Sequence, residues 1–275
     1  MNYIAAELEP HFGRDQLFQQ LASLDGEVFR EVAGRKTQRI MLDGKPYFAK
    51  LHYGVGWWEI AKNLLQARLP VLGARNEWLA LKKLASLKIK SPEPVLYVDE
   101  GMNPASVRSG IVTRALEDMI SLEDYVLAGR PSVHAKRLLT KSLAEVTGRL
   151  HGGGVNHRDC YLCHFLIPRT IVATLDAAPE PPPLYLIDLH RAQIRRRTPL
   201  RWRTKDLGGL LYSAIEAGLT KRDLLRFIRH YTGLELRQTL TEDAATWRGA
   251  LRRARSLYRK THSALPEPVG KLLAW

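Results

Sequence analysis

Residues 157–164 read His-Arg-Asp-Cys-Tyr-Leu-Cys-His, and the interpretation of this stretch decides the fold. Its second half, Cys160-x-x-Cys163-His164, matches the attachment signature of a c-type haem. Haem attachment of that kind normally requires export, and residues 1–15 contain no basic start followed by an apolar stretch. A zinc site would need a second ligand pair, and the chain has only these two cysteines. We therefore interpret Cys160 and Cys163 as small, buried hydrophobic side chains.

The first half of the stretch allows a different chemistry. Catalytic loops of the protein-kinase type begin His-Arg-Asp and carry a metal-binding Asn five residues after the Asp. Here the Asp is Asp159, and His164 occupies the fifth position after it. Three polar residues in a loop are a weak signal alone, so this interpretation depends on the rest of the chain.

Four further segments stand in the order that such a site requires. An apolar stretch, residues 185–187, ends in Asp188, where a metal-binding Asp is expected. Upstream, Lys50 lies near the end of a predicted strand, at the place of a phosphate-binding lysine, and Glu77 lies in the next strongly periodic helix. Asp206 stands near the start of a later helix, like the buried Asp that anchors a kinase catalytic loop. The combined order is far more specific than any one segment.

The elements predicted from the sequence change in character along the chain. Strands are expected at 28–32, 39–42 and 46–51, with a polar turn at 34–37, and at 95–98 and 110–113. Helices are expected at 57–67, 74–87, 121–127 and 132–152 and from 204 onward, with short strands near 165 and 184. This pattern predicts an α+β fold of two lobes, a small β-rich lobe over residues 1–115 and a larger helical lobe over residues 116–275.

Phosphoryl transfer is catalysed mainly by positioning the reacting groups and neutralising their charge, not by covalent catalysis. Each candidate residue therefore has an expected role. Asp159 is the expected catalytic residue, which orients the attacking hydroxyl and accepts its proton. Asp188 is expected to bind Mg²⁺, with His164 at the second metal position, although Mg²⁺ prefers oxygen ligands. The residues expected to bind the phosphates of ATP are Gly34, Arg35, Lys36, Lys50 and Glu77.

Over roughly residues 30–240 the chain resembles the lipopolysaccharide core heptose(I) kinases of Gram-negative bacteria, small members of the protein-kinase-like fold. The segments that carry this resemblance are residues 47–52, 54–60, 69–78, 156–165, 188–193, 201–206 and 218–223. The resemblance implies a two-lobed kinase fold and ATP-dependent phosphorylation of the first inner-core heptose, with Asp159 as the catalytic residue.

Several departures from the general kinase pattern bear on the acceptor. The turn at 34–37, which is expected to cover the phosphates of the nucleotide, has one glycine where the glycine-rich loop of kinases has three. His190 stands at the position of the Gly in the Asp-Phe-Gly motif of kinases. Only 17 residues separate Asp188 from Asp206, and no Ala-Pro-Glu follows. A platform for a peptide substrate hardly fits in that length, which favours a small or glycan hydroxyl. The alternatives are a protein kinase, including one for tyrosine, and an inactive kinase-like scaffold that binds an acidic partner.

Positive charge gathers at the end of the chain. Residues 190–275 hold 19 Lys and Arg against 7 Asp and Glu, whereas residues 1–189 hold 23 against 21. A field of this sign attracts the acidic sugars and phosphates of a lipopolysaccharide core precursor, and it also suits a small acidic protein. Arginines in this part of the chain could line the acceptor site or form a solvated face: Arg191, Arg195, Arg196, Arg197, Arg201 and Arg203. Nucleic acid is not expected as a partner, because no recognised binding module is present.

The expected location is the cytoplasm, since no apolar run approaches the roughly 20 residues that span a bilayer. A peripheral position on the cytoplasmic face of the inner membrane is a second option. It rests on one cluster that could lie on a membrane surface or pack in the core: Trp57, Trp58, Ile60, Leu64 and Leu65, with Lys62 and Arg68.

Overall fold

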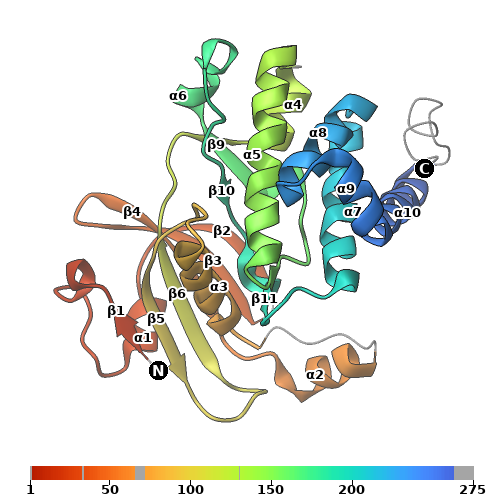
Figure 1. Cartoon of the computed structure of the whole chain (residues 1–275). Coiled ribbons are helices and arrows are strands. Elements are labelled where there is room, and N and C mark those ends of the chain that lie inside the picture. The colour runs from red at the N-terminus through yellow and green to blue at the C-terminus, as the bar shows by residue number, and fades with distance from the viewer. Residues whose placement is uncertain (1, 33, 66–71, 130, 263–275) are drawn as a thin grey trace. The chain divides into compact units, whose positions relative to one another are not determined.

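The computed structural model describes residues 2–32, 34–65, 72–129 and 131–262 (Figure 1). Backbone contacts divide the chain into two compact units. The first unit comprises Met1–Lys83, Pro92–Leu116 and Leu189–Arg191, and the second comprises Leu84–Ser91, Glu117–Asp188 and Ala192–Trp275. The division into folding domains at residue 115 stays a prediction.

The first unit is built on one antiparallel sheet (Figure 1). Its strands, in spatial order, are β1 (Tyr3–Ile4), β5 (Pro94–Glu100), β6 (Arg108–Arg114), β4 (Lys45–His52), β3 (Arg35–Leu42) and β2 (Glu27–Val32). The predicted turn at 34–37 is partly wrong, because Val32 already pairs with Arg35 and the strand begins there. Arg35 and Lys36 are therefore held by ladder hydrogen bonds instead of lying in a turn.

The two faces of this sheet pack against different helices, because side chains alternate along each strand. On one face, Ala49 and Leu51 of β4 belong to a core with helix α1 (Leu17–Ala22). On the other face, Tyr97 of β5 stacks on Trp78 of helix α3 (Arg75–Ser86), with ring centroids 5.2 Å apart. Lys50 alternates with Ala49 and Leu51, so β4 directs it to the face that carries α3.

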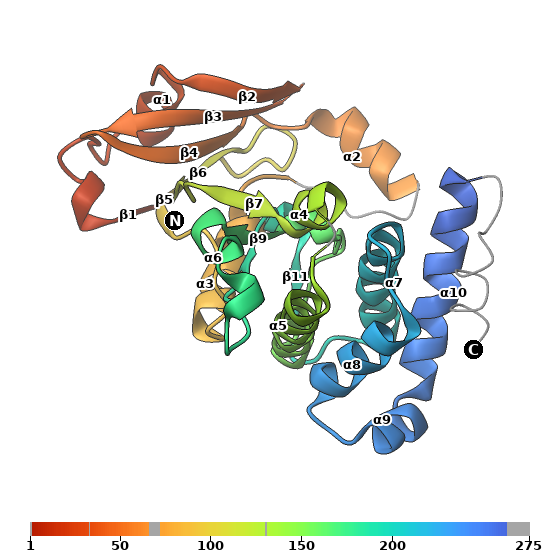
Figure 2. The same ribbon diagram turned by 90° about the horizontal axis from the view of Figure 1, so that it is seen from above.

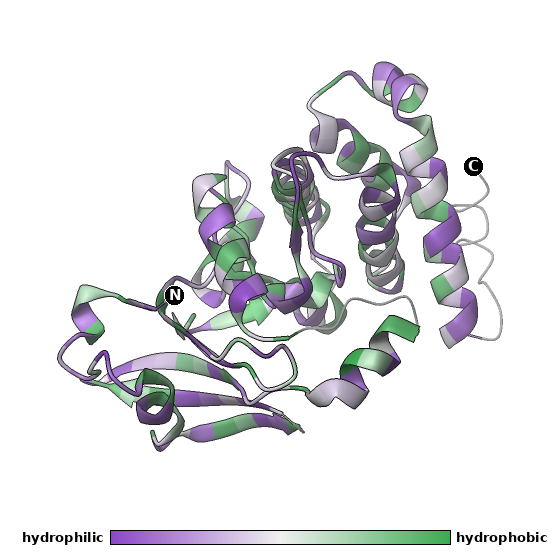
Figure 3. Cartoon of the chain, turned by 90° about the horizontal axis from the view of Figure 1, so that it is seen from below, coloured by the Kyte–Doolittle hydropathy of each residue, from purple (hydrophilic) through white to green (hydrophobic). Residues whose placement is uncertain are grey.

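Helix α2 (Gly56–Leu65) follows β4 and is unusual for its exposed apolar side chains. Trp57 is 63% exposed, Trp58 81% and Leu65 88%, whereas Ile60 is buried. Figure 3 shows the end of α2 among the more hydrophobic parts of the ribbon. Among the helices of the described residues, none is long and apolar enough to cross a membrane.

The second unit is mainly helical (Figure 2). Its helices are α4 (Leu122–Gly129), α5 (Val133–Gly152), α6 (Arg169–Val172), α7 (Leu200–Glu216), α8 (Lys221–Thr232), α9 (Leu236–Glu242) and α10 (Ala244–Thr261). Helices α7 and α10 lie side by side (Figures 1 and 2). Glycines permit this approach: a Cβ at Gly208 of α7 would lie 2.5 Å from the Arg253 side chain of α10, and one at Gly249 would lie 2.7 Å from Thr204. In the same way, Gly148 of α5 allows contact with the backbone of Tyr231 in α8.

Two small sheets complete the second unit. One contains β10 (Tyr185–Leu186), β9 (Phe165–Pro168) and β7 (Met119–Ser121), and the other pairs β11 (Gln193–Ile194) with β8 (Val155–Asn156). The strands β8 and β9 flank residues 157–164, and β10 directly precedes Ile187 and Asp188. These sheets therefore fix the ends of both segments that the sequence analysis singled out.

Candidate active site

The predicted pair of Lys50 and Glu77 is present in the first unit. The Lys50 ammonium lies 2.5 Å from Glu77 Oε1, and the two side chains are 18% and 5% exposed. Lys50 is held at the centre of the sheet, where β4 pairs with Thr37 of β3 and Ile111 of β6. Glu77 directly precedes Trp78, which is 2% exposed and stacks on Tyr97 of the sheet, and this contact fixes α3 against the sheet. The other carboxylate oxygen, Oε2, is buried and has no hydrogen-bond partner among the described residues.

Further polar groups share this region of the first unit. His52 lies two residues after Lys50 and opposite Arg35 in the ladder, and its side chain is buried. Burial, together with the positive charges of Arg35 and Lys50, lowers the pKa of His52 to about 3. The imidazole is therefore neutral at physiological pH. Gly34, directly before Arg35, has a φ of +77°, and a Cβ there would lie 2.6 Å from the carbonyl oxygen of Gly54, so only glycine fits at this position.

The catalytic-loop segment of the second unit is anchored by Asp206 of α7. The buried carboxylate accepts hydrogen bonds from the backbone N–H groups of His157, at 2.6 Å, and Arg158, at 2.8 Å. Arg158 has a φ of +76°, a conformation that is uncommon for a residue with a side chain. Backbone strain of this kind persists only where surrounding contacts enforce it, and it is frequent at functional sites. Asp206 therefore fixes the backbone of the two residues that precede Asp159.

Asp188 is joined to the same loop by two hydrogen bonds through its neighbour Ile187. The His157 Nε2–H donates to the Ile187 carbonyl at 2.9 Å, and the Ile187 N–H donates to the His164 carbonyl at 3.0 Å. Asp188 itself has a φ of +61°, the second strained position in this part of the molecule. The second unit therefore brings the predicted residues Asp159, His164 and Asp188 together on one hydrogen-bonded framework.

The geometry of His164 bears on metal binding. Its Nδ1–H donates to the Asp159 carbonyl at 2.6 Å, which leaves Nε2 as the nitrogen that faces Asp188, 3.6 Å from Oδ2. Asp188 offers an oxygen ligand to Mg²⁺, and one or two carboxylates with water and phosphate oxygens are its usual coordination in proteins. Asp188 fits that ion, whereas an imidazole is a poor ligand for it. In the described part of the chain, no group of three or more His, Cys, Asp or Glu side chains is arranged to hold a metal.

The two cysteines of the loop are free thiols. Burial raises the pKa of Cys160 well above its ordinary value and the pKa of Cys163 to about 11. Both thiols are therefore neutral at physiological pH, and a neutral thiol is a poor nucleophile and a poor metal ligand.

His151 supports the site but was missed by the sequence analysis. It lies near the end of α5, with its Nε2–H 3.3 Å from Asp206 Oδ2 and its Nδ1 accepting a hydrogen bond from the Tyr231 hydroxyl at 2.8 Å. All three side chains are buried. The only sequence signal was a histidine in the last turn of a predicted helix, where a basic residue is common for electrostatic reasons alone.

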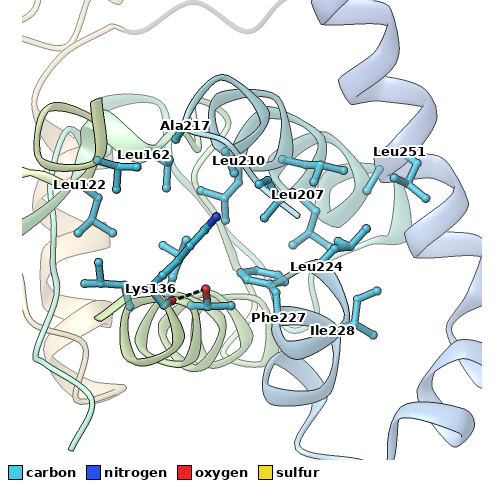
Figure 4. A pocket seen from close by; sticks show the side chains of 18 of the residues that line it. Leu122, Lys136, Leu162, Leu207, Leu210, Ala217, Leu224, Phe227, Ile228 and Leu251 are labelled. Atoms are coloured by element: carbon cyan, nitrogen blue, oxygen red, sulfur yellow. Dashed lines mark hydrogen bonds between the residues drawn. The ribbon is translucent and has the colours of Figure 1, made fainter. Parts of the chain in front are cut away.

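A separate apolar cavity lies in the second unit, between α4, α5, α7, α8 and α10 (Figure 4). Among the residues that line it are Leu143, Leu162, Leu207, Leu210, Leu224 and Phe227. The Lys136 ammonium lies at this cavity, where it donates to the Gly218 carbonyl at 2.7 Å and pairs with Asp223 at 3.0 Å. The lining is almost wholly apolar, so the cavity is chemically suited to an apolar group.

Comparison with known proteins identifies the family to which the chain belongs. The sheet with its Lys–Glu pair and the anchored His-Arg-Asp loop define a protein-kinase-like phosphotransferase. Residues 19–231 match the profile of the lipopolysaccharide kinase (Kdo/WaaP) family, and the chain belongs to that family. The predicted α+β kinase-like fold and the predicted family are thereby confirmed.

Characterised relatives agree with this assignment. The chain is 45% identical over 251 residues to the lipopolysaccharide core heptose(I) kinase WaaP of Pseudomonas aeruginosa, covering 90% of this chain and 92% of that protein. It is 43% identical over 232 residues to the protein of the same name from Escherichia coli K12, covering 83% and 86%. A solved structure titled "WaaP in complex with acyl carrier protein" superposes with a TM-score of 0.80 at 36% identity, covering 94% of this chain and 99% of that one. As a member of a kinase family, the chain is a phosphotransferase that uses ATP.

Proposed function

We propose that this protein transfers the γ-phosphate of ATP to a heptose hydroxyl of the lipopolysaccharide inner core. The observation that carries the proposal is the second unit's framework, in which Asp206 anchors the loop of Asp159 and His157 ties that loop to the segment of Asp188. Relatives named as heptose(I) kinases are 41–45% identical to this chain over 232–252 aligned residues.

In this proposal Asp159 is the catalytic residue. Its carboxylate orients the heptose hydroxyl and accepts its proton as the new P–O bond forms, while the bond from the γ-phosphorus to the β–γ bridging oxygen breaks and ADP leaves. Holding the hydroxyl close to the phosphorus accounts for much of the rate, because a bimolecular step becomes effectively intramolecular.

The nucleotide would be held mainly by charge. Lys50 contacts the phosphates, and Glu77 keeps the Lys50 ammonium in one rotamer. Gly34 lets the backbone approach the phosphates closely, while Arg35 and Lys36 supply positive charge from β3 in place of a glycine-rich loop. Arg35 Nε is buried and has no hydrogen-bond partner among the described residues, so this N–H group is available to donate to a phosphate oxygen.

Mg²⁺ would be held by Asp188, whose carboxylate is 32% exposed. When bound, the ion supplies neutralising charge for the phosphates. His164 was predicted at the second metal position, but its imidazole is a poor ligand for Mg²⁺. Its Nε2 faces the Asp188 carboxylate, and its bond to the Asp159 carbonyl fixes the ring in that orientation.

The proposal is tested by incubating the protein with γ-labelled ATP and purified inner-core glycolipid that lacks the heptose phosphate. Label should appear on the heptose, and Asp159→Asn should reduce transfer by about a thousandfold or more. Asp25→Asn, at an exposed acidic residue of the first unit, is the matched control and should keep full activity. Label on tyrosine or other side chains would favour the protein-kinase alternative, and absence of any transfer would favour the inactive scaffold.

We further propose that the second unit binds a small acidic protein of the acyl-carrier type. The net positive charge of residues 190–275 suits an acidic surface, and the apolar cavity suits an acyl chain. The similar solved structure is a complex with acyl carrier protein, which supports the same class of partner.

We also propose that α2 touches the membrane that carries the acceptor. Trp57, Trp58, Leu64 and Leu65 expose most of their apolar surface, and tryptophan is favoured at membrane interfaces. Lys62 adds a basic group on the same helix, whereas Arg68, predicted as a second one, lies outside the described residues.

A further inference from the structure

Helix α10 carries its charge on one side and with one sign. Its 18 residues include six Lys and Arg and no Asp or Glu. Four exposed arginines follow one another at intervals of four, three and four residues: Arg248, Arg252, Arg255 and Arg259. Because an α-helix turns by about 100° per residue, these positions fall within an arc of about 60°. They form a straight row about 16 Å long, which we call the α10 arginine stripe.

The fold fixes the direction in which the stripe faces. The other side of α10 packs against α7 of the same unit (Figure 2). The side chains on that side are buried: Trp247, Ala250, Leu251, Ala254 and Tyr258. The helix is therefore formed and oriented before any partner arrives. Its apolar residues are used inside the protein, so the stripe offers a partner charge rather than apolar surface.

The charge of the stripe is not neutralised by the described part of the chain. Within residues 2–32, 34–65, 72–129 and 131–262, none of the four arginines forms an ion pair or a side-chain hydrogen bond. Arg248 and Arg252 are like charges at i,i+4, and so are Arg255 and Arg259, a spacing that destabilises a helix. An anionic surface placed against the stripe would offset this repulsion.

The residues beside the arginines indicate the kind of anionic surface. Ala245 and Ser256 are exposed and small, and no large apolar or aromatic side chain of α10 is exposed. Protein interfaces depend on apolar or aromatic anchors in pockets, and single-stranded nucleic acid is held by stacking on aromatic rings. A layer of anionic lipid headgroups needs neither, because each basic residue near it contributes separately.

We propose that the α10 arginine stripe binds the anionic headgroups of a phospholipid membrane. The contact is electrostatic and reversible, since the apolar side of α10 is buried in the protein and cannot enter the lipid. It differs in kind from the contact proposed for α2, which depends on exposed tryptophan and leucine. This inference rests on the proposed function only for the presence of a membrane that carries the acceptor.

The test compares two double variants that remove the same charge. Sedimentation is measured at low salt with vesicles of phosphatidylcholine alone and with about one third phosphatidylglycerol. Arg252→Gln with Arg255→Gln should weaken binding to the anionic vesicles about thirtyfold and leave binding to the neutral vesicles unchanged. The control is Arg222→Gln with Arg237→Gln, at exposed positions of α8 and α9, which should weaken binding less than threefold. Raising the salt to about 0.5 M should release the unmodified protein from the anionic vesicles to the level of the neutral ones.

Other outcomes separate this inference from its alternatives. Equal weakening in the two double variants would show an effect of net charge and would overturn the stripe. Unchanged vesicle binding in the α10 variant, with weaker binding to acyl carrier protein or to duplex DNA, would reassign the stripe to that partner and also overturn the proposal. If Trp57→Ser with Trp58→Ser has no effect on neutral vesicles while the α10 variant behaves as expected, the α2 contact fails and the stripe stands. Absence of transfer to heptose, with the vesicle results as expected, would reject the proposed function alone.

Discussion

Asp188 combines a functional carboxylate with a left-handed backbone, at a φ of +61°. Asn tolerates this conformation nearly as well as Asp, so Asp188→Asn removes the charge and leaves the backbone in place. We expect kcat to fall by about a thousandfold, since a neutral amide binds Mg²⁺ poorly. The thermal midpoint should move by less than about 2 °C, because the side chain is partly exposed. Transfer assays and calorimetry on the same preparation check both statements, and normal transfer would remove Asp188 from the proposed metal site.

His52 makes stability depend on pH in a definite direction. Its pKa in the folded protein is about 3, below the unfolded value of about 6.5. Between these values the unfolded chain binds a proton that the folded protein does not, so stability falls as the pH falls below 6.5. The slope is up to about 1.4 kcal/mol per pH unit, and above pH 6.5 the residue contributes nothing to the pH dependence.

Urea unfolding between pH 5 and 7.5 measures this effect. His52→Gln should flatten the decline, and the exposed His134→Gln is the control and should not. Part of the slope should remain in the variant, because burial also lowers the pKa of His157. An unchanged slope in His52→Gln would mean that the imidazole is protonated or solvated in the folded protein.

At the scale of elements, the sequence predicted best where local signals are strong. The helix α5 follows Ser132, whose hydroxyl accepts a hydrogen bond from the Ala135 N–H, and α3 shows clear helical spacing. In contrast, β1 was missed, because it has two residues and Tyr3 pairs with Tyr97, far along the chain. The predicted start of α7 at residue 204 was also wrong. The helix begins at Leu200, after Pro199, and this extra turn carries Trp202.

The apolar cavity lined by α5, α7 and α8 gives a prediction about acyl-chain binding. Ala214 lines it, so Ala214→Leu should fill space that an acyl chain would occupy. An acylated carrier protein should raise the thermal midpoint of the unmodified protein by several degrees, as any ligand of the folded state does. The rise should be lost in Ala214→Leu and kept in Ala173→Leu, an exposed control on the same unit. If unacylated carrier protein raised the thermal midpoint equally, the acyl chain would not be entering the cavity.

At the scale of the molecule, membrane contact through α2 is testable without activity. Sedimentation with vesicles of neutral and anionic phospholipid should recover the protein, and the double change Trp57→Ser and Trp58→Ser should weaken binding about tenfold. Leu127→Ser removes an apolar side chain that is 60% exposed on α4 and is the matched control. Equal loss in both variants, or no loss in either, would argue against a membrane role of α2.

The site as a whole was only partly predictable. The order of Lys50, Glu77, Asp159 and Asp188 is visible in the sequence because each residue type is fixed by phosphate chemistry. The contacts that hold these residues are not visible. His151 reaches Asp206 across 55 positions, and Arg195 reaches Asn156 across 39. Such pairs depend on tertiary packing, and no local periodicity reports them.

The segment between Asp188 and Asp206 has a consequence for control in the cell. It is short, and it is occupied by the turn Leu189–Arg191 and by β11, whose residues Gln193 and Ile194 are paired with β8. Many kinases place a long loop here and turn it on or off by phosphorylation. This enzyme has no comparable length of chain to rearrange. We expect it to work as soon as it is folded, so that its output follows the delivery of glycolipid and the amount of protein made.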